Sequence, residues 1–248
     1  MSDNTQSQYR MSVDDGIERI LVVSAHPDDV DFGAAGSIAT WTDAGIEVSY
    51  CLVTDGDAGG SDNTITRAEM GQIRRREQTD AAAKVGVTDL HFLAHSDGRV
   101  MASIELRRDL SRVIRKVRPN RVLIQSPERN WDRIYASHPD HLAAGEAAMA
   151  AVYPDARNPF AHPELLEEGF EPWAAREVYV MAHPNSNTAV DITSAIDRKI
   201  AALMCHESQH ADPKMIETLV REWARANAGL AGLDDERRAE IFLRVDTA

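Results

Sequence analysis

The sequence predicts an α/β fold: a single domain with a mostly parallel sheet, helices on both faces and a C-terminal helical extension. Three observations support this prediction. Short β-branched segments alternate with helical ones along the chain, and the helical segments have clear start and stop signals. The composition, 43% hydrophobic and 27% charged over 248 residues, is that of a globular protein. We expect residues 1–16 to form a disordered tail and residues 17–248 to form the domain.

The expected strands are short apolar runs, and they lie at 20–23, 48–53, 90–93, 122–124 and 178–181. The expected helices cover about 34–44, 66–85, 103–117, 139–152 and 191–210, and helix-prone sequence continues to the end. Thr66 and Glu69 form a capping box at the start of one helix, and Ser103 caps another. Parallel strands end at one edge of the sheet, where ligands bind in such folds. The loops after the strands are therefore where we expect a site.

Charge and cysteine content exclude several classes of protein. Lys and Arg number 27 against 40 Asp and Glu, and the resulting formal charge of −13 argues against nucleic acid and anionic membranes as partners. No apolar run approaches the roughly 20 residues of a membrane helix. The first residues lack the pattern of a signal peptide, so we expect a cytoplasmic protein. Cys51 and Cys205 lie in apolar surroundings and are expected to be buried thiols.

The loop after the first strand carries an imidazole and two adjacent carboxylates. It has no G-x-G-x-x-G, and the chain has neither a P-loop nor a G-x-S-x-G elbow, which disfavours nucleotide-binding and serine-hydrolase functions. His26 and Asp29 are a nitrogen and an oxygen ligand three residues apart, a pairing that zinc accepts. Asp28 is then free to act as a base. The structural alternative is that these residues only cap the following helix.

A second His-Pro-Asp unit follows the fourth strand. Pro139 suits the first position of a helix, which puts His138 and His141 on one helix face. One of these histidines would complete a metal site while the other faces the substrate, and Asp140 would orient an imidazole. The alternative is a pair of surface histidines at a helix start. Because both units follow strands that end at the same edge, a shared metal site is favoured.

A third segment matches a different metal motif. His206, Glu207 and His210 fit H-E-x-x-H, the pattern of a zincin peptidase, but the match lies at the end of its expected helix. No histidine follows it, although Glu222 could act as a third ligand. We rank this site below the first, with helix-end packing as its alternative. His183, after the fifth strand, either lines the same cleft or is a loop histidine in solvent.

Taken together, these segments resemble the PIG-L/LmbE-like family of zinc-dependent N-acetylglucosaminyl deacetylases. The resemblance covers roughly residues 20–209. Its motifs are His26-Pro27-Asp28-Asp29 with Gly33 and Gly36, His138-Pro139-Asp140-His141, Arg74-x-x-Glu77, Asp97-Gly98, Asp191-Ile192-Thr193, Lys199 and His206-x-Ser208-Gln209. The last of these also explains the match to the zincin pattern. Ala35 departs from the family, because many members have the first of two glycines there.

The resemblance implies a Rossmann-like sheet and one zinc ion per chain. The candidate residues are His26, Asp29 and His141 for the metal, Asp28, His138 and Asp140 for catalysis, and Arg74, Asp97 and His183 for the substrate. Asp28 is the implied general base, and His138, paired with Asp140, is the implied acid or oxyanion-stabilising group. Arg74 is implied to lie near the sugar.

The expected activity is hydrolysis of an acetamide on an amino sugar or its conjugate, giving acetate and a free amine. The expected partner is thus a small N-acetylated sugar. The alternatives are an amidase acting on a thiol–sugar conjugate, a zincin peptidase, a non-enzymatic binding module and a domain that binds no metal. The sequence leaves the sugar, the choice of zinc or iron, and the oligomeric state open; a homo-oligomer is compatible with it.

Overall fold

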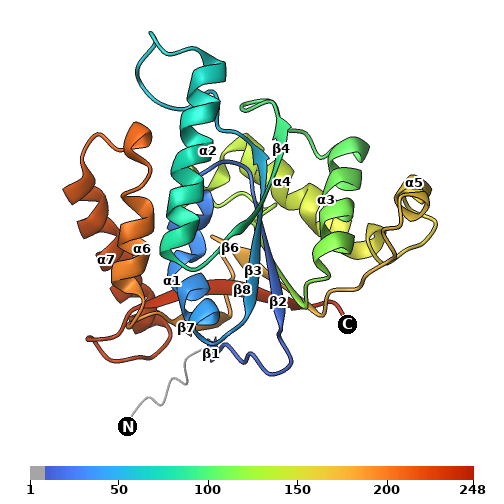
Figure 1. Cartoon of the computed structure of the whole chain (residues 1–248). Helices are drawn as coiled ribbons and strands as arrows, with labels where there is room; N and C mark the ends of the chain where they lie inside the picture. Colours follow the sequence, from blue (N-terminus) through green and yellow to red (C-terminus); the bar gives the residue numbers. More distant parts are fainter. Residues whose placement is uncertain (1–8) are drawn as a thin grey trace.

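The structure, a computed structural model, describes residues 9–248 and contains one eight-stranded sheet (Figure 1). The strands are β1 (Arg10–Met11), β2 (Arg19–Ser24), β3 (Glu47–Thr54), β4 (Asp89–His95), β5 (Arg121–Gln125), β6 (Glu177–Met181), β7 (Thr188–Asp191) and β8 (Ala239–Asp246). Their order is β1-β7-β8-β6-β5-β2-β3-β4. β8 is antiparallel to β6 and β7, and the other neighbouring pairs are parallel. The mostly parallel sheet is thus confirmed.

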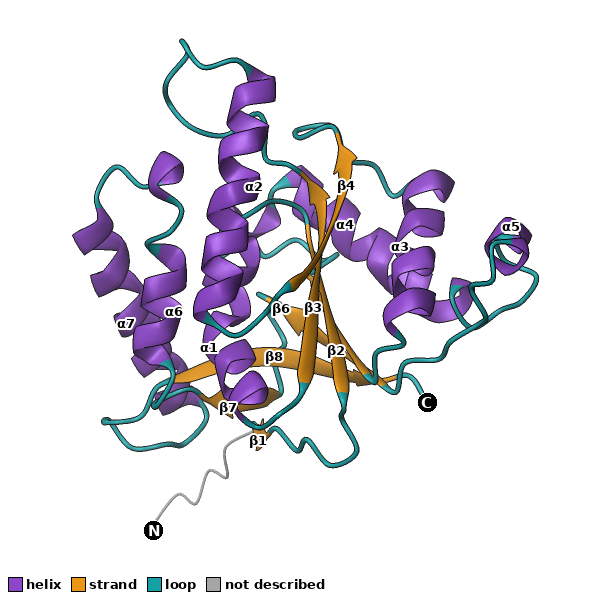
Figure 2. Ribbon diagram, in the orientation of Figure 1, coloured by secondary structure: helices purple, strands orange, loops and turns teal. Residues whose placement is uncertain are grey.

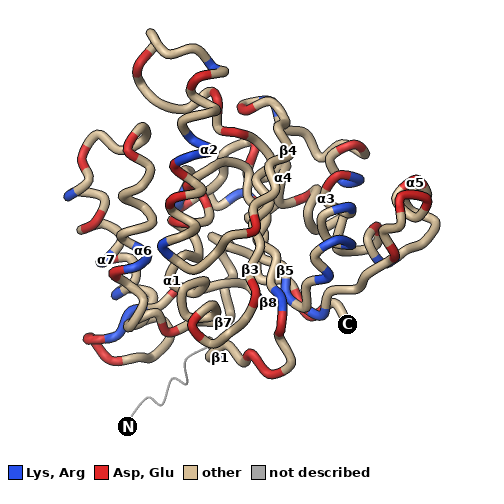
Figure 3. The backbone as a smooth tube through the Cα atoms, in the orientation of Figure 1, with Lys and Arg blue, Asp and Glu red and all other residues tan. Residues whose placement is uncertain are grey.

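Helices cover both faces of this sheet, as the sequence predicts. They are α1 (Asp29–Asp43), α2 (Arg67–Lys84), α3 (Ile104–Val117), α4 (Pro139–Ala150), α5 (Pro163–Glu167), α6 (Ile196–Leu203) and α7 (Pro213–Leu230), with short helical turns η1 (Ile134–Ser137), η2 (Ala151–Asp155) and η3 (Glu207–Gln209). α1, α2, α6 and α7 lie on one side of the sheet, and α3, α4 and α5 lie on the other (Figure 2). Acidic and basic residues are interspersed along α2, whereas α3 carries mainly basic ones (Figure 3).

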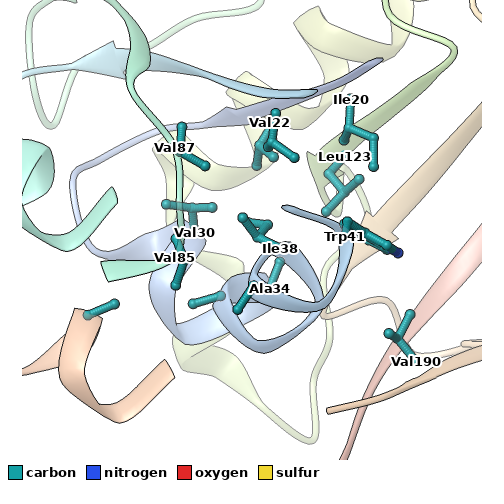
Figure 4. Close-up of a cluster of buried hydrophobic side chains, with 14 of the residues drawn as sticks. Ile20, Val22, Val30, Ala34, Ile38, Trp41, Val85, Val87, Leu123 and Val190 are labelled. Carbon is teal, nitrogen blue, oxygen red and sulfur yellow. The ribbon is translucent and has the colours of Figure 1, made fainter. Parts of the chain in front are cut away.

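The interior strand β2 is apolar from Ile20 to Val23, between Arg19 and Ser24, and helices cover both of its faces. Ile20 and Val22 point into the core under α1, where they join Ile38 (Figure 4). Leu21 and Val23 point to the opposite core, which α3 and α4 cover. Successive side chains of a strand alternate between the two faces of a sheet, so a strand buried on both faces needs an unbroken apolar run.

β2 also lies where the chain changes direction across the sheet. From β2 the chain runs outward through β3 to β4, and then returns to the other side of β2 as β5. The loops after β2 and β5 therefore leave the sheet toward opposite faces. They leave a crevice between them, which is the usual ligand site of such folds. Both His-Pro-Asp units follow these two strands.

The start signals were predicted well, and most boundaries lie within a few residues of the expected ones. The Thr66–Glu69 capping box is present, and Ser103 Oγ accepts the Leu106 N–H. α1 differs, because it begins at Asp29 and not near residue 34. The acidic segment before residue 34 is thus the first turn of the helix itself, where carboxylates are favoured.

The C-terminal third differs more. The helix expected over 191–210 is only the short α6, since β7 precedes it and a bend at Met204–His206 ends it. The sequence after α7 does not stay helical but returns as β8, inserted between β6 and β7. β1 pairs with β7 inside the segment expected to be a tail, while residues 1–8 lie outside the described part. No described helix is long and apolar enough to cross a membrane.

Candidate active site

Side chains from three loops meet at the carboxyl edge of the sheet. His26 follows β2, Asp97 follows β4, and the segment with His138 and His141 follows β5 at the start of α4. Pro139 occupies the first turn of α4, where its missing N–H costs no hydrogen bond. The fold thus brings the two His-Pro-Asp units together, as predicted.

The Asp29 carboxylate lies between two imidazoles. Its Oδ2 is 3.2 Å from His26 Nδ1, and its Oδ1 is 3.0 Å from His141 Nε2. Ligand atoms of His26, His138 and His141 all lie within 4.8 Å of one another. Imidazole nitrogens and a carboxylate oxygen converging on one point are a donor set that zinc accepts. The cluster could therefore hold a metal ion.

The far side of the His26 ring is held by two further carboxylates. His26 Nε2 is 3.2 Å from Asp97 Oδ1 and 3.3 Å from Asp140 Oδ2. Asp140 also accepts the backbone N–H groups of Gly98 and Val100, which fixes its own position. Carboxylates of this kind orient a metal-binding histidine and raise its basicity.

Two expectations are corrected here. The family resemblance implies that Asp140 pairs with His138, but the Asp140 carboxylate contacts His26. Only the backbone N–H of Asp140 reaches His138 Nδ1, at 3.2 Å. Asp97, expected to contact substrate, is 7% exposed and lies behind His26, where it also accepts the Ala58 N–H. Because His138 Nδ1 accepts a hydrogen bond, the neutral ring carries its proton on Nε2.

The electrostatics of the cluster are those of a cation site. Burial alone would lower the pKa of His26, but the charge of Asp29 and hydrogen bonds to Asp140, Asp29 and Asp97 raise it to about 12. The pKa of Asp29 is held well below its usual value by His141 and His26, which outweigh its burial. A divalent cation bound here would take the place of protons, because metal ligands bind in their deprotonated form.

Asp28 is the N-terminal cap of α1 and has an unusual backbone, with φ of 85°. Its N–H donates to Gln78 Oε1 at 2.9 Å, and its Oδ2 lies 3.0 Å from Arg74 Nη2. Burial raises the pKa of Asp28 to about 6, although the Arg74 guanidinium opposes this shift. A carboxyl group with a near-neutral pKa is suited to take and return a proton at physiological pH.

Arg74 supports this loop from behind. Its guanidinium donates to the carbonyl oxygens of Pro27 and Gly56 and to Asp28, and its side chain is buried, at 4% exposed for the residue. The resemblance implies that Arg74 lies near the sugar. The geometry instead favours a residue that positions Asp28, because its donors are directed at the protein.

The H-E-x-x-H match does not form a metal site. His206 lies beyond the end of α6 and is fully buried, with Nε2 2.8 Å from Asp31 Oδ2. His210 Nε2 lies 3.0 Å from the Leu203 carbonyl oxygen. Gln78 Nε2 also donates to Asp31. The pair of His206 and Asp31 therefore supports the far side of the Asp28 loop, and the zincin alternative is not supported.

A cavity of about 400 Å³ opens beside the cluster. Asp28, Asp29 and His141 line one end of it, and His183 lines its wall. His183 is 9% exposed, and its Nδ1 accepts the Asn185 N–H at 3.0 Å. Of the two placements considered for His183, the cavity wall is the one observed.

The remaining walls were missed by sequence reasoning. They come from the loop before α4, from α7 and from β8, and they include Asn130, Arg133, Tyr135, Trp223 and Asn227. These residues belong to no catalytic pattern. The available signal was the density of aromatic and arginine side chains over 129–135, which is unusual for a loop expected only to connect two elements.

The fold and the cluster define a class of protein: an α/β enzyme with a candidate metal centre at the switch point of its sheet. The family described as "PIG-L: GlcNAc-PI de-N-acetylase" matches residues 21–152. This chain belongs to that family, and with it to the deacetylases, which are hydrolases that remove N-acetyl groups.

Individual relatives agree with this membership. The chain is 34% identical over 193 residues to diacetylchitobiose deacetylase of Thermococcus kodakarensis, covering 78% of this chain and 70% of that protein. It is 30% identical over 197 residues to "Probable N-acetyl-alpha-D-glucosaminyl L-malate deacetylase 2" of Bacillus cereus, covering 77% and 83%. The solved structure of N,N'-diacetylchitobiose deacetylase from Pyrococcus horikoshii has a TM-score of 0.87 at 29% identity, covering 94% of this chain and 86% of that one.

Proposed function

We propose that this protein is a zinc-dependent hydrolase that removes the acetyl group from an N-acetylglucosamine conjugate, giving acetate and a free amine. The observation that carries the proposal is the position of Asp28. A carboxyl group with a pKa of about 6 lies directly beside a cluster of imidazoles and Asp29, at one end of the cavity. The named substrates of the relatives, diacetylchitobiose and N-acetylglucosaminyl malate, share the N-acetylated glucosamine unit.

The proposed zinc ligands are His26, Asp29 and His141. Asp29 offers a carboxylate with a lowered pKa, so it is ionised at neutral pH, as a ligand must be. Asp97 and Asp140 hold the His26 ring from its other side. When bound, a zinc ion supplies a Lewis acid that polarises the amide carbonyl and makes water a nucleophile at neutral pH.

Asp28 takes the proton from the attacking water and returns it to the leaving amine. Its near-neutral pKa serves both transfers, because the carboxylate accepts readily and the acid donates readily. Arg74 keeps the carboxylate oriented and limits how far burial raises its pKa. The interaction between Gln78 and the Asp28 N–H holds the backbone in its positive-φ conformation.

His138 supports the developing negative charge on the former carbonyl oxygen. Its ring lies 5.1 Å from that of His26 and 5.3 Å from that of His141, measured between centroids. The Asp140 backbone fixes the tautomer so that Nε2–H can donate. Burial and the charges of His26 and His141 lower the pKa of His138, so the ring acts here as a neutral hydrogen-bond donor.

The test is acetate release from N-acetylglucosamine, diacetylchitobiose and an N-acetylglucosaminide with an acidic aglycone, measured together with the zinc content. We expect about one zinc per chain and acetate release from at least one of the conjugates. A zinc-loaded protein that releases acetate from none of these sugars would contradict the proposal.

A further inference from the structure

The loop before α4 contributes to two arginine–tryptophan pairs, and one of these two pairs lines the cavity. The Arg133 guanidinium stacks 5.0 Å from the centre of the Trp223 ring of α7, and both residues line the cavity. The Arg129 guanidinium stacks 5.6 Å from the centre of Trp131, and neither residue belongs to the cavity lining. The same chemical pair thus occurs once inside the site and once outside it.

The Arg133 guanidinium has no carboxylate partner among the described residues, although the chain carries 40 acidic residues against 27 basic ones. Lys199, another cation of the cavity wall, differs: it is 3% exposed and paired with Glu240. Arg133 therefore presents free N–H donors and an uncompensated positive charge to the cavity. Stacking on an indole restricts a guanidinium while leaving its edge available for hydrogen bonds.

The cavity that this pair lines has several apolar wall residues. They are Val220 and Ala224 of α7, Met181 of β6 and Ile241 of β8, and polar residues such as Asn130 and Asn227 lie among them. A cavity of about 400 Å³ leaves room beside a single pyranose ring for a second group of the substrate. A cavity with apolar wall residues and one free guanidinium fork suits a group that has a carbon skeleton and an anionic end.

We propose that Arg133 and Trp223 form a subsite for the aglycone of the substrate, and that this aglycone carries a carboxylate or phosphate group bound by the Arg133 guanidinium. The inference rests on the proposed deacetylase function and narrows its substrate class. It favours an anionic N-acetylglucosaminide over a neutral disaccharide. The subsite lies partly on α7, outside the residues 21–152 that match the family as a whole.

The test compares matched substrates that differ only in charge: an N-acetylglucosaminide of a hydroxy acid, its neutral amide, and the corresponding phosphate ester. For the wild type we expect kcat/KM to favour the carboxylate over the amide by about tenfold or more, as a charge-assisted hydrogen bond provides. Arg133→Gln should abolish this preference, so that the carboxylate and the amide are hydrolysed with similar kcat/KM. Arg129→Gln, the matched control, should keep it. A phosphate preferred over the carboxylate would identify the anion as a phosphate.

Binding separates failure of the subsite from failure of the chemistry. In zinc-loaded Asp28→Asn protein, where turnover is slow, calorimetry should give tighter binding of the carboxylate than of the amide, and the added Arg133→Gln change should remove the difference. Equal binding of the two ligands, or a preference that survives in Arg133→Gln, overturns the inference. If the wild type binds the carboxylate selectively but releases no acetate from it, the proposed function fails while the subsite stands.

Discussion

Among the segments that place a histidine against an aspartate, 26–29 and 206–210 can be compared, and the first of these two borders the cavity. At 26–29, the His26 ring touches three carboxylates, and Asp28 and Asp29 line the open space beside it. At 206–210, His206 is fully buried against Asp31, which is fully buried as well. The residue types are alike, and the surroundings differ.

The difference shows what separates a site from a structural pair. A metal site needs several lone pairs that point to one place and room for a ligand. At 206–210, by contrast, the His206 ring is directed at the Asp31 carboxylate, and both side chains are buried. Gln78 connects the two segments, because it bonds both the Asp28 N–H and the Asp31 carboxylate. The buried pair thus supports the backbone of the open one.

Removing the two histidines is the strongest way to sharpen this comparison. We expect His26→Ala to lose zinc and all detectable activity. His206→Ala should keep zinc and lower the free energy of unfolding by about 3–5 kcal/mol, because it leaves a buried aspartate without its partner. Metal analysis and chemical denaturation measure the two effects. Loss of zinc only in His206→Ala would reverse the assignment.

Asp28 and Asp29 are adjacent carboxylates with different proposed roles. Asp28→Asn should retain zinc and substrate affinity while kcat falls by roughly 10²–10⁴, since an amide cannot accept the proton. Asp29→Ala should lose the metal as well as the activity. Steady-state kinetics with metal analysis decide this point. An Asp28→Asn variant with most of the wild-type kcat would require another base.

Gln78 tests the connection between the segments. Gln78→Leu keeps the volume but removes both hydrogen bonds, so we expect kcat to fall about tenfold with KM and zinc content nearly unchanged. Thr79→Ala, on the exposed side of α2, is the control and should have no effect on kcat. If both variants lose only stability and keep kcat, Gln78 does not position the base.

The pH profile gives the smallest expected effect. Because burial raises the pKa of Asp28 to about 6, kcat/KM should fall as pH drops through 6 with the uptake of one proton. The folded state holds this proton more tightly than the unfolded chain does, so Asp28 contributes less to stability as pH rises from about 4 to 6.

Arg74 influences the pH at which kcat/KM falls on the acid side of the profile, which we call the acidic limb. Its charge lowers the pKa of Asp28, so Arg74→Gln should move the limb to higher pH. Arg75→Gln is the control, because Arg75 pairs with Asp55 and does not contact Asp28. An unchanged limb in Arg74→Gln would contradict the proposed coupling.

Local signals predicted the fold and the site where a side chain acts within its own segment. The capping box at Thr66 and the proline at position 139 depend on neighbours within a few residues, and both were predicted correctly. The two His-Pro-Asp units were brought together by a general rule of parallel sheets. Partners across the chain were less predictable: Asp140 pairs with His26 and not with the adjacent His138, because the loop after β4 fixes its carboxylate.

The C-terminal region was mispredicted for a related reason. α7 and β8 bury modest apolar faces against elements far away in the sequence, and no spacing rule connects Trp223 with Arg133. The H-E-x-x-H match failed because a pattern of letters carries no information about whether its histidines stay open to solvent. Tertiary contacts decided both outcomes.

The insertion of β8 between β6 and β7 has a consequence for how the chain is made. β7, and β1 through it, join the sheet only by way of β8 (Ala239–Asp246), which follows all the other described strands along the chain. During translation the core around β2 can assemble before β8 has been synthesised. β1 and β7 cannot join the sheet until β8 is available. The exposed edge of β6 is therefore the place where a nascent or truncated chain would pair with another copy and aggregate.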